Sequence, residues 1–210
     1  MLLRILVIIS LIFQVSWAAA DSYDDLLTAI KLDDIAVAEA LFARGMDVNT
    51  TDPGANTLLM LAVRENHMDL VRRLLERQAK VGARNRHGET ALMLAAAGGN
   101  LEMVKLLVER DARINQAGWS PLIYAAWQGR TEVVRYLLEK SAEIDALSPN
   151  GISALMIAAR GGHFDTVKLL LWEVADPNLK SDSGVTALAW ALKAGNTEIA
   201  DLLRQAGAKE

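Results

Sequence analysis

The three histidines are the side chains in this sequence best suited to bind a metal ion or to exchange protons near neutral pH. His67 and His163 stand at equivalent places in two similar segments, whereas His87 is alone in a polar stretch. No two of them have the i, i+4 spacing that brings two ligands onto one helical face, and the chain contains no cysteine. We therefore predict no metal site, and we interpret His67 and His163 as structural residues of turns between helices.

Carboxylates and glycine pairs are the other groups that could serve a reaction. One carboxylate recurs near the start of each of five apolar segments, where a negative charge complements a helix dipole, and such recurrence indicates structure rather than an active site. These residues are Asp69, Glu102, Glu132, Asp165 and Glu198. The glycine pairs at 98–99 and 161–162 are not followed by Gly-Lys-Ser/Thr, so they form no phosphate-binding loop. We predict a non-catalytic protein without a cofactor.

The composition favours a packed protein over a disordered or polytopic membrane protein, because 52% of the residues are apolar and 23% are charged. The formal net charge is -4 and the pI is about 5.5. A chain with this balance has no overall positive field to attract nucleic acid. We therefore predict no nucleic-acid partner. Stability is expected to come from packing, since no disulfide can form.

Residues 1–20 differ in kind from the rest of the chain. Arg4 gives a positive start, a long apolar run follows, and three alanines precede Asp21. This order predicts a secretory signal peptide cleaved before Asp21, and therefore an exported mature chain, residues 21–210, that resides in the periplasm. The alternative is an uncleaved anchor helix, because residues 2–20 are nearly long enough to span a bilayer.

A repeat of 33 residues organises the chain after this segment. Five segments align without adjustment, and their first hydroxyl residues, at positions 57, 90, 120, 153 and 186, are 33, 30, 33 and 33 residues apart. Each segment is followed by a short polar turn and a second apolar-periodic run, which predicts two short helices per unit. Thr or Ser at the head of each unit can cap the first helix. One helix pair cannot bury its apolar face alone, so the units are expected to stack.

These segments resemble ankyrin repeats, whose Thr-Pro-Leu-His-x-Ala signature occurs in degenerate form, most closely at Ser120-Pro121-Leu122. The resemblance covers residues from about 24 to 208. It implies an all-α solenoid of about six helix-turn-helix units joined by hairpin loops, with atypical units at both ends. The expected ankyrin-repeat domain, residues 21–210, divides into repeats at 21–51 (the N-terminal cap), 52–84, 85–117, 118–147, 148–180 and 181–210 (the C-terminal cap).

Two departures from the ankyrin pattern are expected to matter. A glycine in the left-handed conformation usually ends the second helix, but four copies replace it. The replacements are Gln78, Asp111, Ser141 and Val174. The branched Val174 is the most costly of these, so we expect local irregularity in its turn. The second departure is the hairpin before Gly118, which is three residues short.

The resemblance also implies where a partner would bind, because hairpin tips and the exposed edge of the first helices usually line a concave groove in ankyrin-repeat proteins. The residues that fall on this edge are Lys31, Arg64, Ala97, Trp127, Arg160 and Lys193. Four of the six are cationic, so the groove is expected to hold an acidic or hydrogen-bonding segment, with Trp127 as an aromatic anchor. The alternative is that the cations only keep this face soluble.

The shortened hairpin adds Trp119 to the predicted site. A hairpin without three residues leaves a notch at mid-stack, and Trp119 and Trp127 are both expected to face it. The alternative is that the two indoles fill the gap. Tyr124 and Trp190 stand at positions usually held by Leu, so we assign them to the core. The predicted protein-binding residues are Lys31, Arg64, Trp119, Trp127, Arg160 and Lys193.

The leading hypothesis is a monomeric, periplasmic adaptor that binds another protein through its groove and hairpin tips. The chain resembles small exported bacterial ankyrin proteins that are thought to support or protect partner enzymes. Two alternatives stay open. A membrane-tethered scaffold would result if residues 1–20 remained attached, and a secreted effector or neutralising protein would carry the same signal peptide.

Overall fold

The computed structural model describes residues 22–209, which form two compact units divided between Lys80 and Val81. The predicted signal peptide, residues 1–20, lies outside the described residues. Regular structure in residues 22–209 is helical, apart from one isolated antiparallel bridge between Thr51 and Thr57. The prediction of an all-α repeat fold is therefore confirmed.

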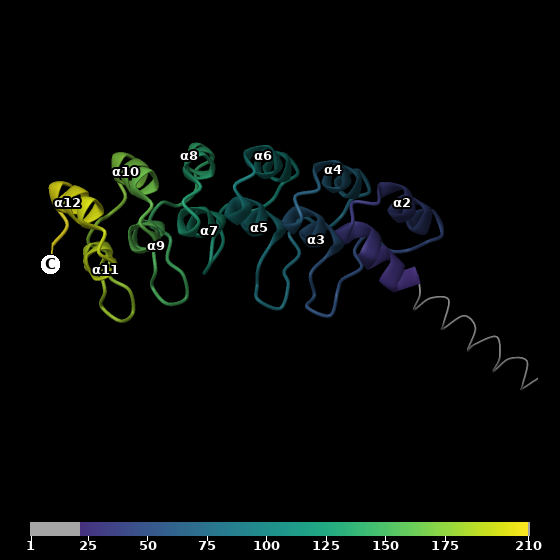
Figure 1. Ribbon diagram of the computed structural model, residues 1–210, viewed down its shortest axis with the longest axis horizontal. Coiled ribbons are helices and arrows are strands. Elements are labelled where there is room, and N and C mark those ends of the chain that lie inside the picture. The colour runs from purple at the N-terminus through teal and green to yellow at the C-terminus, as the bar shows by residue number, and fades with distance from the viewer. Residues whose placement is uncertain (1–21, 210) are drawn as a thin grey trace, which may run out of the picture. The chain divides into compact units, whose positions relative to one another are not determined.

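Each unit is built from helix pairs (Figure 1). In the first unit, residues 22–31 are helical and are followed by α2 (Ile35–Ala43), α3 (Leu58–Arg64) and α4 (Met68–Glu76). The second unit contains α5 (Ala91–Gly98), α6 (Leu101–Glu109), α7 (Pro121–Trp127), α8 (Thr131–Glu139), α9 (Ala154–Gly161), α10 (Phe164–Trp172), α11 (Ala187–Ala194) and α12 (Thr197–Gln205). Within the second unit, α5, α7, α9 and α11 pack in succession as one layer, and α6, α8, α10 and α12 form the other (Figure 1).

Five of the first helices begin directly after a Thr or Ser residue whose hydroxyl caps them. Thr90 has an extended backbone, and its side chain accepts a hydrogen bond from the backbone N–H of Met93 at 3.3 Å. Ser120 caps α7 in the same way and is followed by Pro121 at a position that needs no backbone N–H. The equivalent caps in the other repeats are Thr57, Ser153 and Thr186. All five predicted caps are confirmed.

In the second unit, the core runs between the two helix layers. Large side chains of the first helices are buried against apolar faces of the second helices, and small side chains lie where neighbouring first helices approach one another. The buried alanines of the second unit's first helices include Ala95, Ala96, Ala125, Ala126, Ala158 and Ala159. Their small size lets α5, α7 and α9 pack closely in register, as the repeat pattern predicts.

The four non-glycine residues predicted at the ends of second helices do adopt the left-handed conformation, with φ between 62° and 66°. Val174 closes α10 with hydrogen bonds from its own N–H to Leu171 O at 3.1 Å and from the N–H of Ala175 to Leu170 O at 2.9 Å. The same two bonds close α8 after Ser141. The prediction of local irregularity at Val174 is therefore wrong for the hydrogen bonds, which keep the regular pattern. Only the φ of this branched residue is unfavourable.

Candidate protein-binding face

The residues predicted to bind a partner lie at the C-terminal ends of first helices and in the hairpin before α7. Lys31 and Arg64 are exposed residues of the first unit. In the second unit, Trp127 ends α7 with 47% of its surface exposed, and Arg160 and Lys193 are exposed at the ends of α9 and α11. Trp119 precedes the cap of α7 and is half-buried.

A side chain from the following repeat binds the backbone at three positions of this edge, Lys31, Ala97 and Trp127. The Nε2 of His163 lies 2.9 Å from the carbonyl oxygen of Trp127, and it donates the hydrogen bond because a carbonyl oxygen can only accept. The Nε of Arg130 donates to the carbonyl of Ala97 at 3.0 Å. The same contact joins His67 to Lys31 O at 3.1 Å within the first unit. In the last repeat, Asn196 Nδ2 donates to Ala159 O at 2.9 Å, one residue before the equivalent position. The structural role predicted for His67 and His163 is confirmed.

His163 is held by close contact with two glycines as well as by its hydrogen bond. Gly129 has a φ of 64°, and a Cβ on it would lie 2.5 Å from His163 Nδ1. A Cβ on Gly161 would lie 2.6 Å from His163 Nε2. The imidazole therefore occupies the space that side chains at these turn positions would fill. This packing fixes the imidazole, and through it the end of α7 that carries Trp127.

Trp119, Tyr124 and Trp127 form an aromatic cluster at α7. The rings of Trp119 and Trp127 stack with their centroids 6.0 Å apart and their planes at 29°. Tyr124 meets both indoles edge-on, at 6.0 Å from Trp119 and 6.3 Å from Trp127. Both arrangements are favourable for ring quadrupoles. The cluster brings together the two tryptophans predicted from the sequence, and it leaves Trp127 about half exposed.

Tyr124 is tied to the hairpin of the preceding repeat. Its hydroxyl donates to Glu89 Oε1 at 2.9 Å, and the other carboxylate oxygen of Glu89 accepts from Asn85 Nδ2 at 2.7 Å. Burial, followed by the hydrogen bond to Glu89, raises the pKa of the Tyr124 phenol far above its ordinary value. Tyr124 therefore stays protonated and remains a donor. The assignment of Tyr124 to the core was incomplete, because the ring is only partly buried and forms one wall of the cluster.

The hairpin before α7 is shorter than those before α9 and α11, as predicted (Figure 1). Asn115 accepts from the N–H of Glu143 at 2.9 Å, which is the contact that Asn178 makes with Lys209 in the last repeat. Asn178 lies eight residues before its cap and Asn115 only five before Ser120, so the missing residues come from the hairpin tip. Gln116 closes the shortened loop by donating from Nε2 to Trp119 O at 3.0 Å.

Arg160 and Trp190 form a second contact on the same face. The guanidinium carbon of Arg160 lies 5.3 Å from the centre of the Trp190 ring, in the next repeat, which is the geometry of a cation–π interaction. Sequence reasoning placed Trp190 in the core, but its ring is only half-buried. The positive charge of Arg160, which was predicted to bind a partner, thus contacts the Trp190 ring of the protein itself. Lys193 is exposed at the end of α11.

A metal-ligand cluster and a membrane-spanning helix are two features that the described part of the chain lacks. Within residues 22–209, no group of three or more His, Asp or Glu side chains could hold a metal ion. In the same stretch, every helix is too short or too polar to cross a bilayer. The candidate site in the second unit is the end of α7 together with the exposed residues Arg160 and Lys193 at the ends of α9 and α11.

The stacked helix pairs define this chain as an all-α repeat solenoid. A sequence model described as ankyrin repeats in three copies matches residues 26–117, 59–148 and 141–210, so the chain belongs to the ankyrin-repeat family. Proteins of this family are generally protein–protein interaction modules and are typically non-catalytic. No curated protein matches the chain.

Proposed function

We propose that the chain is a periplasmic adaptor that binds one partner protein through the exposed ends of its first helices. The observation that carries the proposal is the aromatic cluster, in which Trp127 is held by Trp119 and Tyr124 and is still 47% exposed. A rigid, half-exposed indole loses little conformational freedom on binding, and tryptophan is enriched among residues that dominate binding energies.

The partner segment is expected to carry acidic or hydrogen-bonding groups. Arg160 and Lys193 follow Trp127 along successive first helices, and Lys31 and Arg64 occupy the corresponding edge in the first unit. Opposite charges across such a face guide encounter and fix the orientation of a partner more than they add affinity. The aromatic cluster therefore supplies the anchor, and the cations select an acidic segment.

The test is affinity purification from the native compartment with the wild-type chain and with a Trp127→Ala, Arg160→Glu variant. Mass spectrometry quantifies each recovered protein. Arg110→Glu is the matched control for charge reversal, because Arg110 is an exposed cation at the end of a second helix. We expect the partner to be lost with the double variant and kept with the control. Equal recovery with all three proteins would remove this face from consideration.

Export and removal of residues 1–20 belong to the same proposal and are tested separately. The apolar run and the three alanines before Asp21 support cleavage at that point. Mass spectrometry of the protein isolated from cells is expected to show an N-terminus at Asp21, in the periplasmic fraction. A chain that keeps residues 1–20 and sediments with membranes would instead support a tethered scaffold, and recovery from the culture medium would support a secreted protein.

A further inference from the structure

The end of α10 departs from the ends of α4, α6 and α8 at three consecutive positions. The equivalent triplets are Glu76-Arg77-Gln78 after α4, Glu109-Arg110-Asp111 after α6 and Glu139-Lys140-Ser141 after α8, whereas α10 has Trp172-Glu173-Val174. The other triplets thus share an acidic residue, a basic residue and a small or polar residue. The α10 triplet replaces all three.

None of the three replacements gains packing for the folded protein, and those at 173 and 174 are unfavourable. Trp172 leaves 82% of its surface exposed, and Val174 leaves 81% exposed although its φ of 66° is a conformation that branched residues avoid. Glu173 puts a negative charge at the C-terminus of a helix, where a basic residue complements the dipole after α4, α6 and α8. Consecutive violations of local rules without any gain in packing are expected at functional sites.

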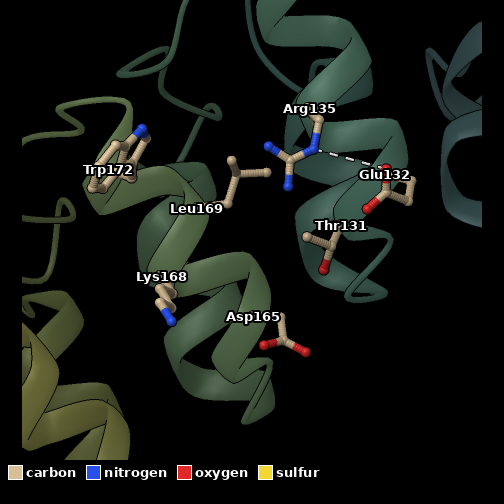
Figure 2. Close-up of a pocket in the computed structure, with 7 residues that line it drawn as sticks. All are labelled: Thr131, Glu132, Arg135, Asp165, Lys168, Leu169 and Trp172. Carbon is tan, nitrogen blue, oxygen red and sulfur yellow. Dashed lines mark ion pairs between the residues drawn. The ribbon is translucent and has the colours of Figure 1, made fainter.

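Trp172 also stands at one end of a groove between α8 and α10, with a volume of about 460 Å³. Figure 2 shows Arg135 and Leu169 facing one another across this groove, with Asp165 toward the end opposite Trp172. The Nε of Arg135 lies 3.8 Å from Oε2 of Glu132, so the charge of Arg135 is balanced within α8. Lys168 lines the groove as well and follows Asp165 by one helical turn. With Glu173 added, this region carries one more carboxylate than cations.

The rest of the protein indicates what would cover Trp172. Three other aromatic rings have a cation of the protein itself over their faces: Arg77 lies 5.2 Å from the centre of the Phe42 ring, Lys105 lies 5.6 Å from that of Tyr136, and Arg160 lies 5.3 Å from that of Trp190. Within residues 22–209 no cation lies over Trp172, although indole is the best of these rings for a cation–π contact. An exposed indole beside an unbalanced carboxylate fits a cation supplied from outside.

We propose that Trp172, Glu173 and Val174 dock a basic segment of a partner protein. An Arg or Lys side chain of that segment stacks on the Trp172 indole and pairs with the Glu173 carboxylate. An apolar side chain next to it covers Val174. This surface belongs to the second helices and does not depend on the binding proposed for Trp127, so the chain has two separate docking points with opposite charge preferences.

The test uses the full chain and a variant that copies the corresponding corner of α8, namely Trp172→Glu with Glu173→Lys and Val174→Ser. A displayed library of random dodecapeptides is selected on the wild-type protein. Enriched peptides are then synthesised, and their affinities for the wild-type protein, the variant and Trp127→Ala are measured by fluorescence anisotropy. Each peptide is also made with its Arg and Lys residues replaced by Glu.

We expect enriched peptides that contain Arg or Lys next to an apolar residue. Their binding should weaken about tenfold or more with the triple variant, stay unchanged with Trp127→Ala, and vanish when the peptide cations become Glu. The variant should also unfold at a higher temperature than the wild-type protein, so that lost binding does not reflect lost structure. Peptides that bind the triple variant equally well, or that are acidic, would overturn the proposal.

Two other molecules that could cover Trp172 would give distinct results. If the corner joins two copies of this chain, sedimentation will show a wild-type dimer that the triple variant abolishes. If it inserts into a lipid surface, the wild-type protein will partition onto phosphatidylcholine vesicles and the variant will not. Either result, obtained without selection of basic peptides, would refute docking of a basic segment.

Discussion

Replacing Val174 with glycine is expected to stabilise the protein, against the usual outcome for a substitution to glycine. Val174 has a φ of 66°, and a residue with a Cβ loses about 1–2 kcal/mol in the left-handed conformation. Its side chain is 81% exposed, so its removal forfeits little buried surface. The hydrogen bonds that close α10 involve only backbone atoms and are kept.

The opposing effect is the freedom that glycine adds to the unfolded chain, which costs about 0.5–1 kcal/mol. The expected net gain in unfolding free energy is therefore about 0.5–1 kcal/mol, or about 2 °C in Tm. Equilibrium unfolding in urea, followed by far-UV circular dichroism, measures the first quantity, and a thermal scan measures the second.

Two matched variants sharpen the measurement. Ser141→Gly, at a φ of 63° after α8, should gain less stability than Val174→Gly, because serine is not β-branched. Val174→Thr keeps a branched side chain and should gain nothing. A loss of stability in Val174→Gly, or an equal gain in Val174→Thr, would refute the strain argument.

Three further predictions concern the second unit. His163→Ala should lower the unfolding free energy by about 1–2 kcal/mol in urea titrations, and His163→Asn should lose less, because Asn196 makes the same kind of contact one repeat later. Ser153→Ala should cost about 1 kcal/mol by the same assay, whereas Ser153→Thr, the residue found at three equivalent caps, should be nearly neutral. Tyr124 keeps its proton in the folded state and loses it near its ordinary pKa of 10.0 when unfolded, so the stability it contributes is complete below that pH and declines above it. Unfolding free energies measured up to about pH 10.5 should therefore fall less steeply for Tyr124→Phe, and equal slopes would contradict the raised pKa.

The repeat pattern was sufficient to predict the helix pairs, their caps and the shortened hairpin. This succeeded because each of these features is encoded within a single repeat. The capping hydroxyls of Thr90 and Ser153 accept from N–H groups only three residues later, so each cap lies within its own repeat. The deletion before Gly118 was visible because the other hairpins in the chain served as the standard of length.

Contacts between repeats were harder to predict. Tyr124 bonds to Glu89, which lies 35 residues earlier, and Arg160 covers the ring of Trp190, 30 residues later. Periodicity places these side chains on a helix, but their direction depends on the twist from one repeat to the next. A sequence signal existed all the same: Tyr124 and Trp190 are aromatic at a position that is aliphatic in the other copies. Within residues 172–174, the sequence indicates only the strain at Val174, because the exposure of Trp172 depends on how much of it α8 covers.

The bonds that His163 and Arg130 make to the preceding repeat end on main-chain oxygens, those of Trp127 and Ala97. Every amino acid has the same main-chain oxygen, so these hydrogen bonds do not depend on the side chain of the residue that accepts them. Alanine and tryptophan already occupy such anchored positions in the second unit, and lysine does so in the first. A single substitution at one of these positions therefore changes the side chain offered to a partner and leaves the hydrogen bonds between repeats intact.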